Sequence, residues 1–373
     1  MLTLLSGFVF ASSALHAEKT GKPLVIYLDR FGIPKSLFGG GGPALCLHQH
    51  TAGTRLFWLD ATHLFVAFTT IAPCTFHAAE EMPMLRGLVF DTTTGIKVAS
   101  HDWPLTEDLA IFPGPDHTVV MRDGNKLELL NEKLQMADSG ELDSTPKGLW
   151  STPRRRTIPL LTSDGRKYEF YTAGPLRLLD TISLDSSDEV RAIPDWVAGD
   201  ERIAGSSCAD KSPYSCTKID VQTPDAKFLE PDGAPWSYRE TGKPVSLQPI
   251  GFLDATHLII TREDKNFFHN AQMLIVTPNG SRIQLPSIGE LYPRKIAGIA
   301  EHGSRFGMEM YALGGCTDCI IANFFVVAEP DARKFLFEQR GTPYMSAGEL
   351  SPDGRWMAIL DEGRVSLYPL PQM

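Results

Sequence analysis

Short apolar segments separated by polar turns run along almost the whole chain. The clearest example is the hexapeptide Leu-Asp-Ala-Thr-His-Leu, which occurs at residues 59–64 and again at residues 253–258, each time followed by further apolar residues. Two apolar segments joined by a polar turn predict a β-hairpin. The repetition of this pattern therefore predicts an all-β protein built from hairpins.

The same type of turn recurs at a regular spacing under a relaxed spelling. Asp, Pro and Gly are common in these turns because they favour turn geometry. Four-stranded blades of a β-propeller occupy ~40 to 50 residues each. The predicted turns lie between 38 and 56 residues apart and are anchored at Asp60, Asp116, Arg154, Asp200, Asp254, Gly303 and Asp353. This spacing predicts seven blades.

Most of the units also carry a second turn between two further apolar segments. These second turns lie at residues 91–95, 130–133, 171–174, 223–225, 277–280 and 329–331. The last unit has none after residues 364–368, so we expect the apolar run at residues 23–28 to supply its fourth strand, which would close the ring and cover an exposed sheet edge. The prediction is an all-β, seven-bladed β-propeller of four-stranded antiparallel blades over residues 18–373.

Residues 1–17 resemble a signal peptide. They are apolar and end in Ala-Leu-His-Ala, the small-x-small pattern that signal peptidase cleaves, here after Ala17. We therefore expect an exported protein, periplasmic or extracellular. The segment departs from the usual pattern because no Lys or Arg precedes its apolar part, and a buried N-terminal strand is the alternative.

Hydropathy and charge limit the classes of partner. No later segment is apolar over the ~18 residues that a membrane span needs, so we expect no span. The net charge of −10 argues against a nucleic-acid partner, because phosphate backbones require concentrated Lys and Arg. The one basic run, at residues 154–156, is interpreted as a solvated turn.

Residues 350–360, Leu-Ser-Pro-Asp-Gly-Arg-Trp-Met-Ala-Ile-Leu, resemble the repeat signature of WD40-like and TolB-type β-propellers. The second turns resemble those of exported seven-bladed propellers of the YncE type. The resemblance covers nearly all of residues 18–373 as a repeat pattern and is specific at one or two blades. It implies a fold and no activity. The Trp-Asp repeat endings of eukaryotic WD40 proteins do not recur, so the partners of that subfamily are not carried over.

The two faces of such a ring differ in their connections. If the strands of a blade are labelled A to D outward from the axis, A–B and C–D turns lie on one face, the turn face. B–C loops and D–A connections lie on the other, the loop face. Long segments at residues 69–86, 206–216, 262–272 and 312–323 fall between B and C strands, and binding usually resides in such variable loops. His63 and His257 lie on the turn face, where we expect them to cap a turn or to lie in solvent rather than to bind a metal.

All six cysteines are predicted on the loop face, where an even number in an exported protein indicates disulfides. We expect Cys208 to pair with Cys216, Cys46 with Cys74, and Cys316 with Cys319. A redox role for the last pair is less favoured, because it follows glycines and precedes a strand rather than opening a helix. Ile320 follows the motif where haem attachment needs His, and a four-cysteine zinc site would have to bridge non-adjacent blades.

Linear signatures of catalysis are absent from the sequence. It contains no H-E-x-x-H, no G-x-S-x-G, no P-loop and no Asp-rich calcium loop. The glycines at residues 39–42 precede Pro43 and are interpreted as a connector. His48 and His50 could form a metal pair, but no third ligand can be named and ordinary polar surface is favoured. We predict no cofactor and no metal.

Trp, Tyr and Arg are the residues most enriched at binding hot spots. Those predicted on D–A connections of the loop face are Trp103, Trp236, Tyr238, Arg239, Tyr292, Arg294, Arg340 and Tyr344. We predict an exported, non-catalytic propeller that binds a protein, peptide or glycan through a disulfide-braced loop face. The alternative is an extracytoplasmic enzyme, a lyase or hydrolase, whose catalytic residues lie on several blades around the mouth of the central channel.

Overall fold

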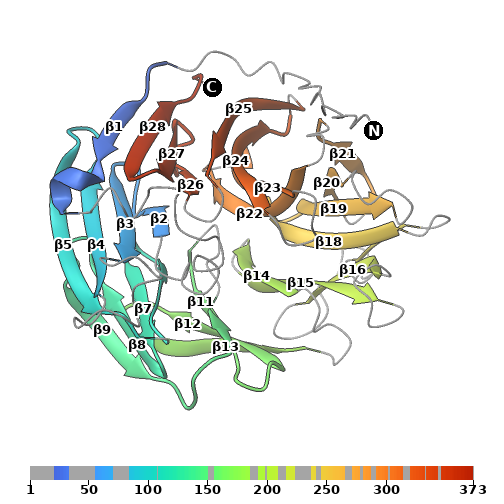
Figure 1. The fold of residues 1–373 in the computed structure, drawn as a ribbon. Coiled ribbons are helices and arrows are strands. Elements are labelled where there is room, and N and C mark those ends of the chain that lie inside the picture. Colours follow the sequence, from blue (N-terminus) through green and yellow to red (C-terminus); the bar gives the residue numbers. More distant parts are fainter. Residues whose placement is uncertain are drawn as a thin grey trace, which may run out of the picture.

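A computed structural model describes residues 21–32, 55–69, 84–106, 108–149, 155–184, 192–197, 200–208, 216–222, 237–240, 245–264, 271–277, 280–286, 291–300, 303–313, 320–331, 333–342 and 346–372 of the chain. These residues form seven four-stranded antiparallel sheets arranged around one axis, as Figure 1 shows. The predicted all-β, seven-bladed propeller is confirmed.

The blades follow one another in chain order, and each begins at its innermost strand. Blades 1 to 3 contain β2 (Arg55–Trp58), β3 (His63–Thr69), β4 (Met84–Asp91) and β5 (Ile96–Pro104); β6 (Ala110–Pro113), β7 (Val119–Asp123), β8 (Lys126–Leu130) and β9 (Met136–Glu141); β10 (Gly148–Leu149), β11 (Ile158–Leu161), β12 (Lys167–Thr172) and β13 (Arg177–Ser183). Blades 4 and 5 contain β14 (Ala192–Val197), β15 (Asp200–Cys208), β16 (Cys216–Gln222) and β17 (Ser237–Arg239); β18 (Val245–Phe252), β19 (Leu258–Asp264), β20 (Gln272–Val276) and β21 (Arg282–Gln284). Blades 6 and 7 contain β22 (Leu291–Ile299), β23 (Phe306–Leu313), β24 (Ile320–Glu329) and β25 (Lys334–Gly341); β26 (Ala347–Leu350), β27 (Trp356–Asp361), β28 (Arg364–Pro369) and β1 (Leu24–Tyr27).

The predicted turn anchors mark the blades correctly. Each falls between the first and second strand of a blade, except that Asp200 is the first residue of β15 and Arg154 lies outside the described residues. The second turns fall between the third and fourth strands, with residues 223–225 again outside the described part. The spacing of turn residues was therefore sufficient to locate the blades.

The B–C loops are shorter than predicted, because three hairpins continue further into them. In blade 6, β23 runs to Leu313 and β24 begins at Ile320, and these two residues are register partners. Likewise β15 extends to Cys208 and β19 to Asp264. Backbone hydrogen bonds do not require apolar side chains, so pairing continues past the point where the apolar pattern ends. The remaining residues of these loops lie outside the described residues.

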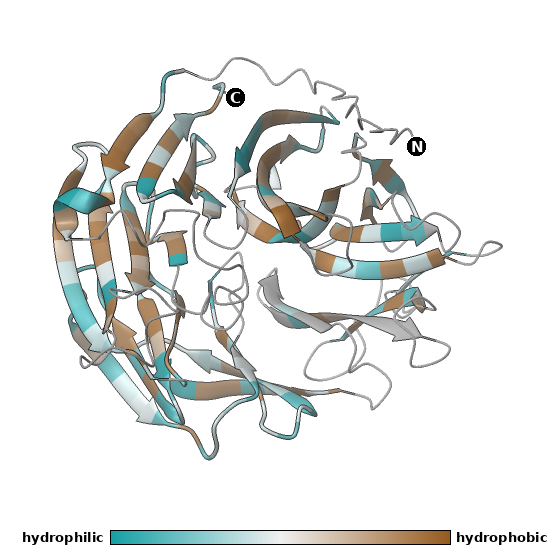
Figure 2. Cartoon of the chain, in the orientation of Figure 1, coloured by the Kyte–Doolittle hydropathy of each residue, from teal (hydrophilic) through white to brown (hydrophobic). Residues whose placement is uncertain are grey.

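Neighbouring blades are held together by apolar packing between their faces. The buried apolar side chains of the described residues form seven clusters, each joining two adjacent blades. In β3, Leu64 and Val66 pack toward blade 7, whereas Phe65 and Ala67 pack toward blade 2. Strands buried on both faces are apolar in succession rather than alternating, and Figure 2 shows such an apolar stretch along β3.

Strand β1 closes the ring, as predicted. It pairs antiparallel with β28, with Ile26 opposite Val365, so that the last blade gains its fourth strand (Figure 1). A short 3-10 helix, η1 (Leu28–Phe31), follows and begins with a Leu28 N–H that donates to the carbonyl of Gly363 at 3.0 Å. Ile26 and Leu28 are buried in the cluster between blades 7 and 1.

Ring closure predicts that the neighbouring residues Ile26, Tyr27 and Leu28, at the end of β1 and the start of η1, differ sharply in their contribution to stability. Replacing buried Ile26 or Leu28 by Ala removes apolar packing and leaves a cavity, which should lower the free energy of unfolding by about 2–5 kcal/mol each. Tyr27→Ala is the matched control, because the Tyr27 side chain is 48% exposed, and it should cost about 0.5 kcal/mol or less. Urea unfolding followed by tryptophan fluorescence measures the difference, and equal midpoints for Ile26→Ala and Tyr27→Ala would contradict the closure.

Candidate functional site

Charged side chains gather where the innermost strands surround the axis of the ring. They come from blades 1, 3, 6 and 7, and ion pairs or electrostatic coupling connect them to one another. We call this set the axial charge group; its members are Arg55, Arg155, Arg294, Lys295, Glu309 and Glu349.

Glu349 on β26 is the buried centre of the first half of this group. Its carboxylate accepts hydrogen bonds from the Arg155 guanidinium and, at 3.1 Å, from the backbone N–H of Trp58. Arg155 also donates to the Trp58 carbonyl, and the Trp58 indole N–H donates to the Glu349 carbonyl at 3.1 Å. One arginine from blade 3 therefore connects blades 1 and 7.

The environment of Glu349 has opposing effects on its pKa. Burial raises the pKa, while the nearby cations Arg155 and Lys295 lower it, and the net change is upward. Burying an ion pair of this kind costs desolvation free energy, which the attraction between the two charges must offset. Arg155 is therefore the group that keeps an ionised Glu349 tolerable inside the ring.

The interpretation of the basic run at residues 154–156 as a solvated turn is wrong for Arg155. Only 15% of its side chain is exposed, and its ion-pair partner lies 194 residues further along the chain. Arg156 is exposed, as expected, and Arg154 lies outside the described residues. The sequence showed a run of like charges but could not show that the turn of blade 3 reaches blades 1 and 7.

Glu309 on β23 is the centre of the second half of the group. Arg294 Nη1 lies 3.0 Å from Oε1 of this carboxylate, and Lys295 Nζ lies 3.3 Å from Oε2. A β-bulge between Pro293 and Lys295 interrupts the register, which lets two consecutive residues reach the same partner. Glu309 is 4% exposed at its side chain, whereas Arg294 and Lys295 are 52% and 59% exposed.

Arg55 on β2 of blade 1 contacts blade 2 and is influenced electrostatically by the second half of the group. Its Nε donates to the carbonyl of Ile111 at 3.1 Å, and its guanidinium lies 5.4 Å from the centre of the Phe112 ring. Burial lowers the pKa of Arg55, the charge of Arg294 lowers it further, and Glu309 opposes both. Arg55 and Arg294 therefore act on one another from different blades.

Two tyrosines stand at the loop-face end of the same hairpin. Tyr292 on β22 and Tyr311 on β23 are register partners whose rings stack with centroids 5.5 Å apart and planes 22° apart. Both side chains are partly exposed. Along the hairpin, the tyrosine pair comes first and the Lys295–Glu309 pair follows toward the turn face.

Only some of the residues that the sequence predicted on the loop face are exposed in the structure. The six described ones lie in strands rather than in D–A connections. Trp103 and Tyr238 are buried between blades, because the ends of the outer strands still pack against their neighbours. The exposed ones are Arg239, Arg294 and Arg340, Tyr292 is half-buried, and Trp236 and Tyr344 lie outside the described residues.

One of the predicted cysteine pairs falls within the described residues. Cys208 and Cys216 are backbone register partners at the ends of β15 and β16, and Cys216 is buried. Cys46, Cys74, Cys316 and Cys319 lie outside the described residues, as do His48, His50 and the glycines at 39–42.

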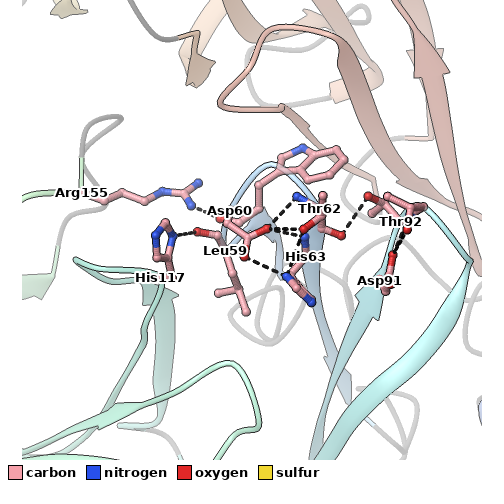
Figure 3. A network of polar contacts seen from close by, with 10 residues as sticks. Leu59, Asp60, Thr62, His63, Asp91, Thr92, His117 and Arg155 are labelled. Atoms are coloured by element: carbon pink, nitrogen blue, oxygen red, sulfur yellow. Dashed lines mark hydrogen bonds and ion pairs between the residues drawn. The ribbon is translucent and has the colours of Figure 1, made fainter.

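In the repeated hexapeptide the Asp side chain closes the turn, and neighbouring segments bond to its carbonyl groups. The Asp60 carboxylate accepts the backbone N–H groups of Thr62 at 2.6 Å and His63 at 2.8 Å, and His63 Nδ1 lies 2.8 Å from Asp60 Oδ2, as Figure 3 shows. Asp254 makes the same contacts in the second copy. Burial raises the pKa of each Asp, but these hydrogen bonds outweigh it and the pKa is lowered. Each Asp therefore caps the turn and each histidine contacts that Asp, which agrees with the first of the two roles expected for the histidines.

The described part of the chain has no group of three or more His, Cys, Asp or Glu placed to hold a metal ion. None of its helices is long and apolar enough to cross a membrane. A pocket of about 130 Å³ lies between blades 1 and 2 and is lined by Trp103, Pro104, Leu109, Met121, Asp123, Lys126 and Glu128.

Comparison with solved structures shows the same fold at low sequence identity. The hydrazine synthase of Kuenenia stuttgartiensis is 13% identical, with 86% of this chain and 96% of that chain covered and a TM-score of 0.51. WD40-like neighbours include the β-propeller domain of Cps50 (Swd1) from Myceliophteria thermophila (9% identity, 86% and 97% covered, TM-score 0.48) and the C-terminal WD40 domain of Sif2 (10%, 86% and 97%, 0.44). No protein-family model and no curated protein sequence matches the chain. These similarities extend to the fold alone.

The Arg155–Glu349 pair predicts a pH-dependent loss of stability when it is broken. Arg155→Met leaves a buried carboxylate without its ion-pair partner and should lower the free energy of unfolding by about 3–5 kcal/mol near neutral pH. Burial raises the pKa of Glu349 in the folded state above its value of ~4.3 in the unfolded chain. The contribution of Glu349 to the free energy of unfolding is therefore fully present below pH ~4.3 and is lost as the pH rises through the folded-state pKa. Without Arg155 that pKa rises further, so the deficit should be larger at about pH 8 than at about pH 5.

Two further variants distinguish the loss of this buried ion pair from the general effect of removing an arginine. Arg355→Met removes an arginine that is 77% exposed and should cost about 0.5 kcal/mol or less. Adding Glu349→Gln to Arg155→Met removes the buried charge and should restore part of the stability. Urea unfolding at both pH values measures all three, and a deficit that is independent of pH would contradict the proposed role of Arg155.

Proposed function

We propose that the protein is an exported, non-catalytic β-propeller that binds a protein, peptide or glycan partner through its loop face. The observation that carries this proposal is the stacked pair of Tyr292 and Tyr311 at the loop-face end of blade 6, beside the exposed Arg294. Tyrosine and arginine are the residue types that dominate binding hot spots.

The setting of these residues favours binding over a purely structural role. All three lie on paired strands of one hairpin, so their backbone is already ordered before a partner arrives. A rigid scaffold reduces the entropy that association costs. Their partly exposed side chains can therefore present a fixed surface of aromatic and cationic groups.

The export part of the proposal rests on residues 1–17 and on the cysteines. Opposite residues of an antiparallel pair have Cα atoms about 4.5–5.5 Å apart, within the separation of ~4.4–6.8 Å that disulfides need. Cys208 and Cys216 are such partners, and no described cysteine is a free thiol. The pairs Cys46–Cys74 and Cys316–Cys319 belong to the same proposal, as does the likeness of the repeat pattern to exported propellers.

The cysteine pairing predicts a protein without reactive thiols. The protein isolated from an oxidising compartment and denatured without reductant should react with no maleimide, and after reduction it should react at all six cysteines. Reduction of the Cys208–Cys216 disulfide, or Cys216→Ser, should lower the free energy of unfolding by about 2–4 kcal/mol. Mass spectrometry reads the labelling, and two thiols mapped to Cys316 and Cys319 would instead favour a redox function.

The binding role predicts that partner capture depends on the tyrosine pair. Immobilised wild-type protein should retain a partner from the surrounding extract that Tyr292→Ala and Tyr311→Ala retain at least about tenfold less, the size of a hot-spot loss. Ile96→Ala is the control, because Ile96 is 62% exposed at the turn-face end of β5. Quantitative mass spectrometry of the retained proteins and released glycans gives the measurement, and equal retention by all three variants would contradict the proposal.

A further inference from the structure

Cations outnumber carboxylates in the axial charge group. It contains four cations and two carboxylates, although the whole chain has a net charge of −10. Arg155 and the backbone of Trp58 already engage Glu349. Glu309 is therefore the carboxylate that Arg294 and Lys295 share, with Arg55 coupled to both charges from blade 1. A local positive surplus in an acidic protein favours an anionic partner at this point.

Two of the four positive groups are well exposed to solvent. Arg294 and Lys295 are 52% and 59% exposed at their side chains, whereas Glu309 is 4% exposed. Glu309 thus fixes the two cations from beneath while they project outward. A guanidinium has five N–H donors and an ammonium has three, so both groups can bind a second carboxylate while keeping their contact with Glu309.

The strand that carries these cations is also an edge strand of its sheet. β22 is hydrogen-bonded to β23 and ends its sheet at the axis, and with 9 residues it is the longest innermost strand of the described chain. The presence of Pro293 is typical of such an edge strand. Exposed edges accept extended peptides as added strands, with the backbone giving affinity and side-chain contacts giving specificity.

We propose that β22, from Tyr292 near its loop-face end to Lys295 at its middle, binds an extended acidic peptide segment, whose carboxylates pair with Arg294 and Lys295 and whose chain passes the Tyr292–Tyr311 stack. This inference rests on the proposed binding function of the loop face and names its ligand class. An edge strand with two separate cations and an aromatic stack matches a chain with spaced carboxylates better than a single compact anion. Charge complementarity selects acidic over neutral peptides.

Titration of the purified protein with a penta-glutamate peptide tests the proposal. Isothermal titration calorimetry at about pH 7 and low salt should detect binding, and a penta-glutamine peptide of the same length should bind at least tenfold more weakly. Arg294→Gln and Lys295→Gln should each weaken penta-glutamate binding severalfold. Arg355→Gln, which removes an exposed arginine on the turn face, should leave it unchanged. The affinity should fall as salt rises, because exposed charges are screened.

A gain of affinity separates ligand binding from damage to the fold. Glu309→Gln keeps the shape of the buried side chain but removes the carboxylate that competes for Arg294 and Lys295. This variant should bind penta-glutamate several times more tightly than the wild type, a result that misfolding cannot produce. Unchanged or weaker binding by Glu309→Gln, with thermal unfolding like that of the wild type, would overturn the proposal.

Other anions give outcomes that overturn the proposal rather than extend it. Inorganic phosphate or a heparin fragment that binds in an Arg294-dependent manner, while penta-glutamate does not, would assign the site to a different anion. Equal affinity for glutamate and glutamine peptides would remove the role of the cations. If penta-glutamate fails but Tyr292→Ala still abolishes partner capture, the acidic-peptide inference is wrong and the binding function of the loop face stands.

Discussion

The whole structure depends on apolar packing between the faces of neighbouring blades. Each blade buries one set of alternating side chains against the blade before it and the other set against the blade after it. In β24, Val326 and Ala328 pack toward blade 5, whereas Phe325 and Val327 pack toward blade 7. Burying side chains of this size contributes about 1.5–3 kcal/mol each. A blade therefore needs two neighbours, which is why the chain must close into a ring and why β1 has to complete the last blade.

Closure brings residues from distant blades together at the axis. Arg155, Trp58 and Glu349 come from three blades, and they form one hydrogen-bonded unit only because the innermost strands converge. The unit is costly to break, since the buried carboxylate would lose its only arginine partner among the described contacts. The same convergence places Arg55 of blade 1 within electrostatic reach of Arg294 and Glu309 of blade 6.

The two faces of the ring differ in how their polar side chains are held. On the turn face, Asp60 and His63 bond to one another and to their own backbone within four residues, as do Asp254 and His257. Along β22, from its loop-face end to its middle, Tyr292, Arg294 and Lys295 are held by partners on β23 and still present exposed surface. The proposed binding function and its acidic ligand follow from this difference, because a group that is positioned but still accessible is ready to bind.

The sequence by itself determined the number of blades, the location of their turns and the strand that closes the ring, because turn residues and apolar alternation are local properties that repeat along the chain. It also identified Tyr292 and Arg294 as candidates from their residue type. Only the tertiary structure decided that Trp103 and Tyr238 are buried, that Arg155 is internal and that Lys295 and Arg55 join Arg294 around Glu309. The physical reason is that burial and ion pairing at the axis depend on which blades face one another, and residues 194 positions apart carry no local pattern that relates them.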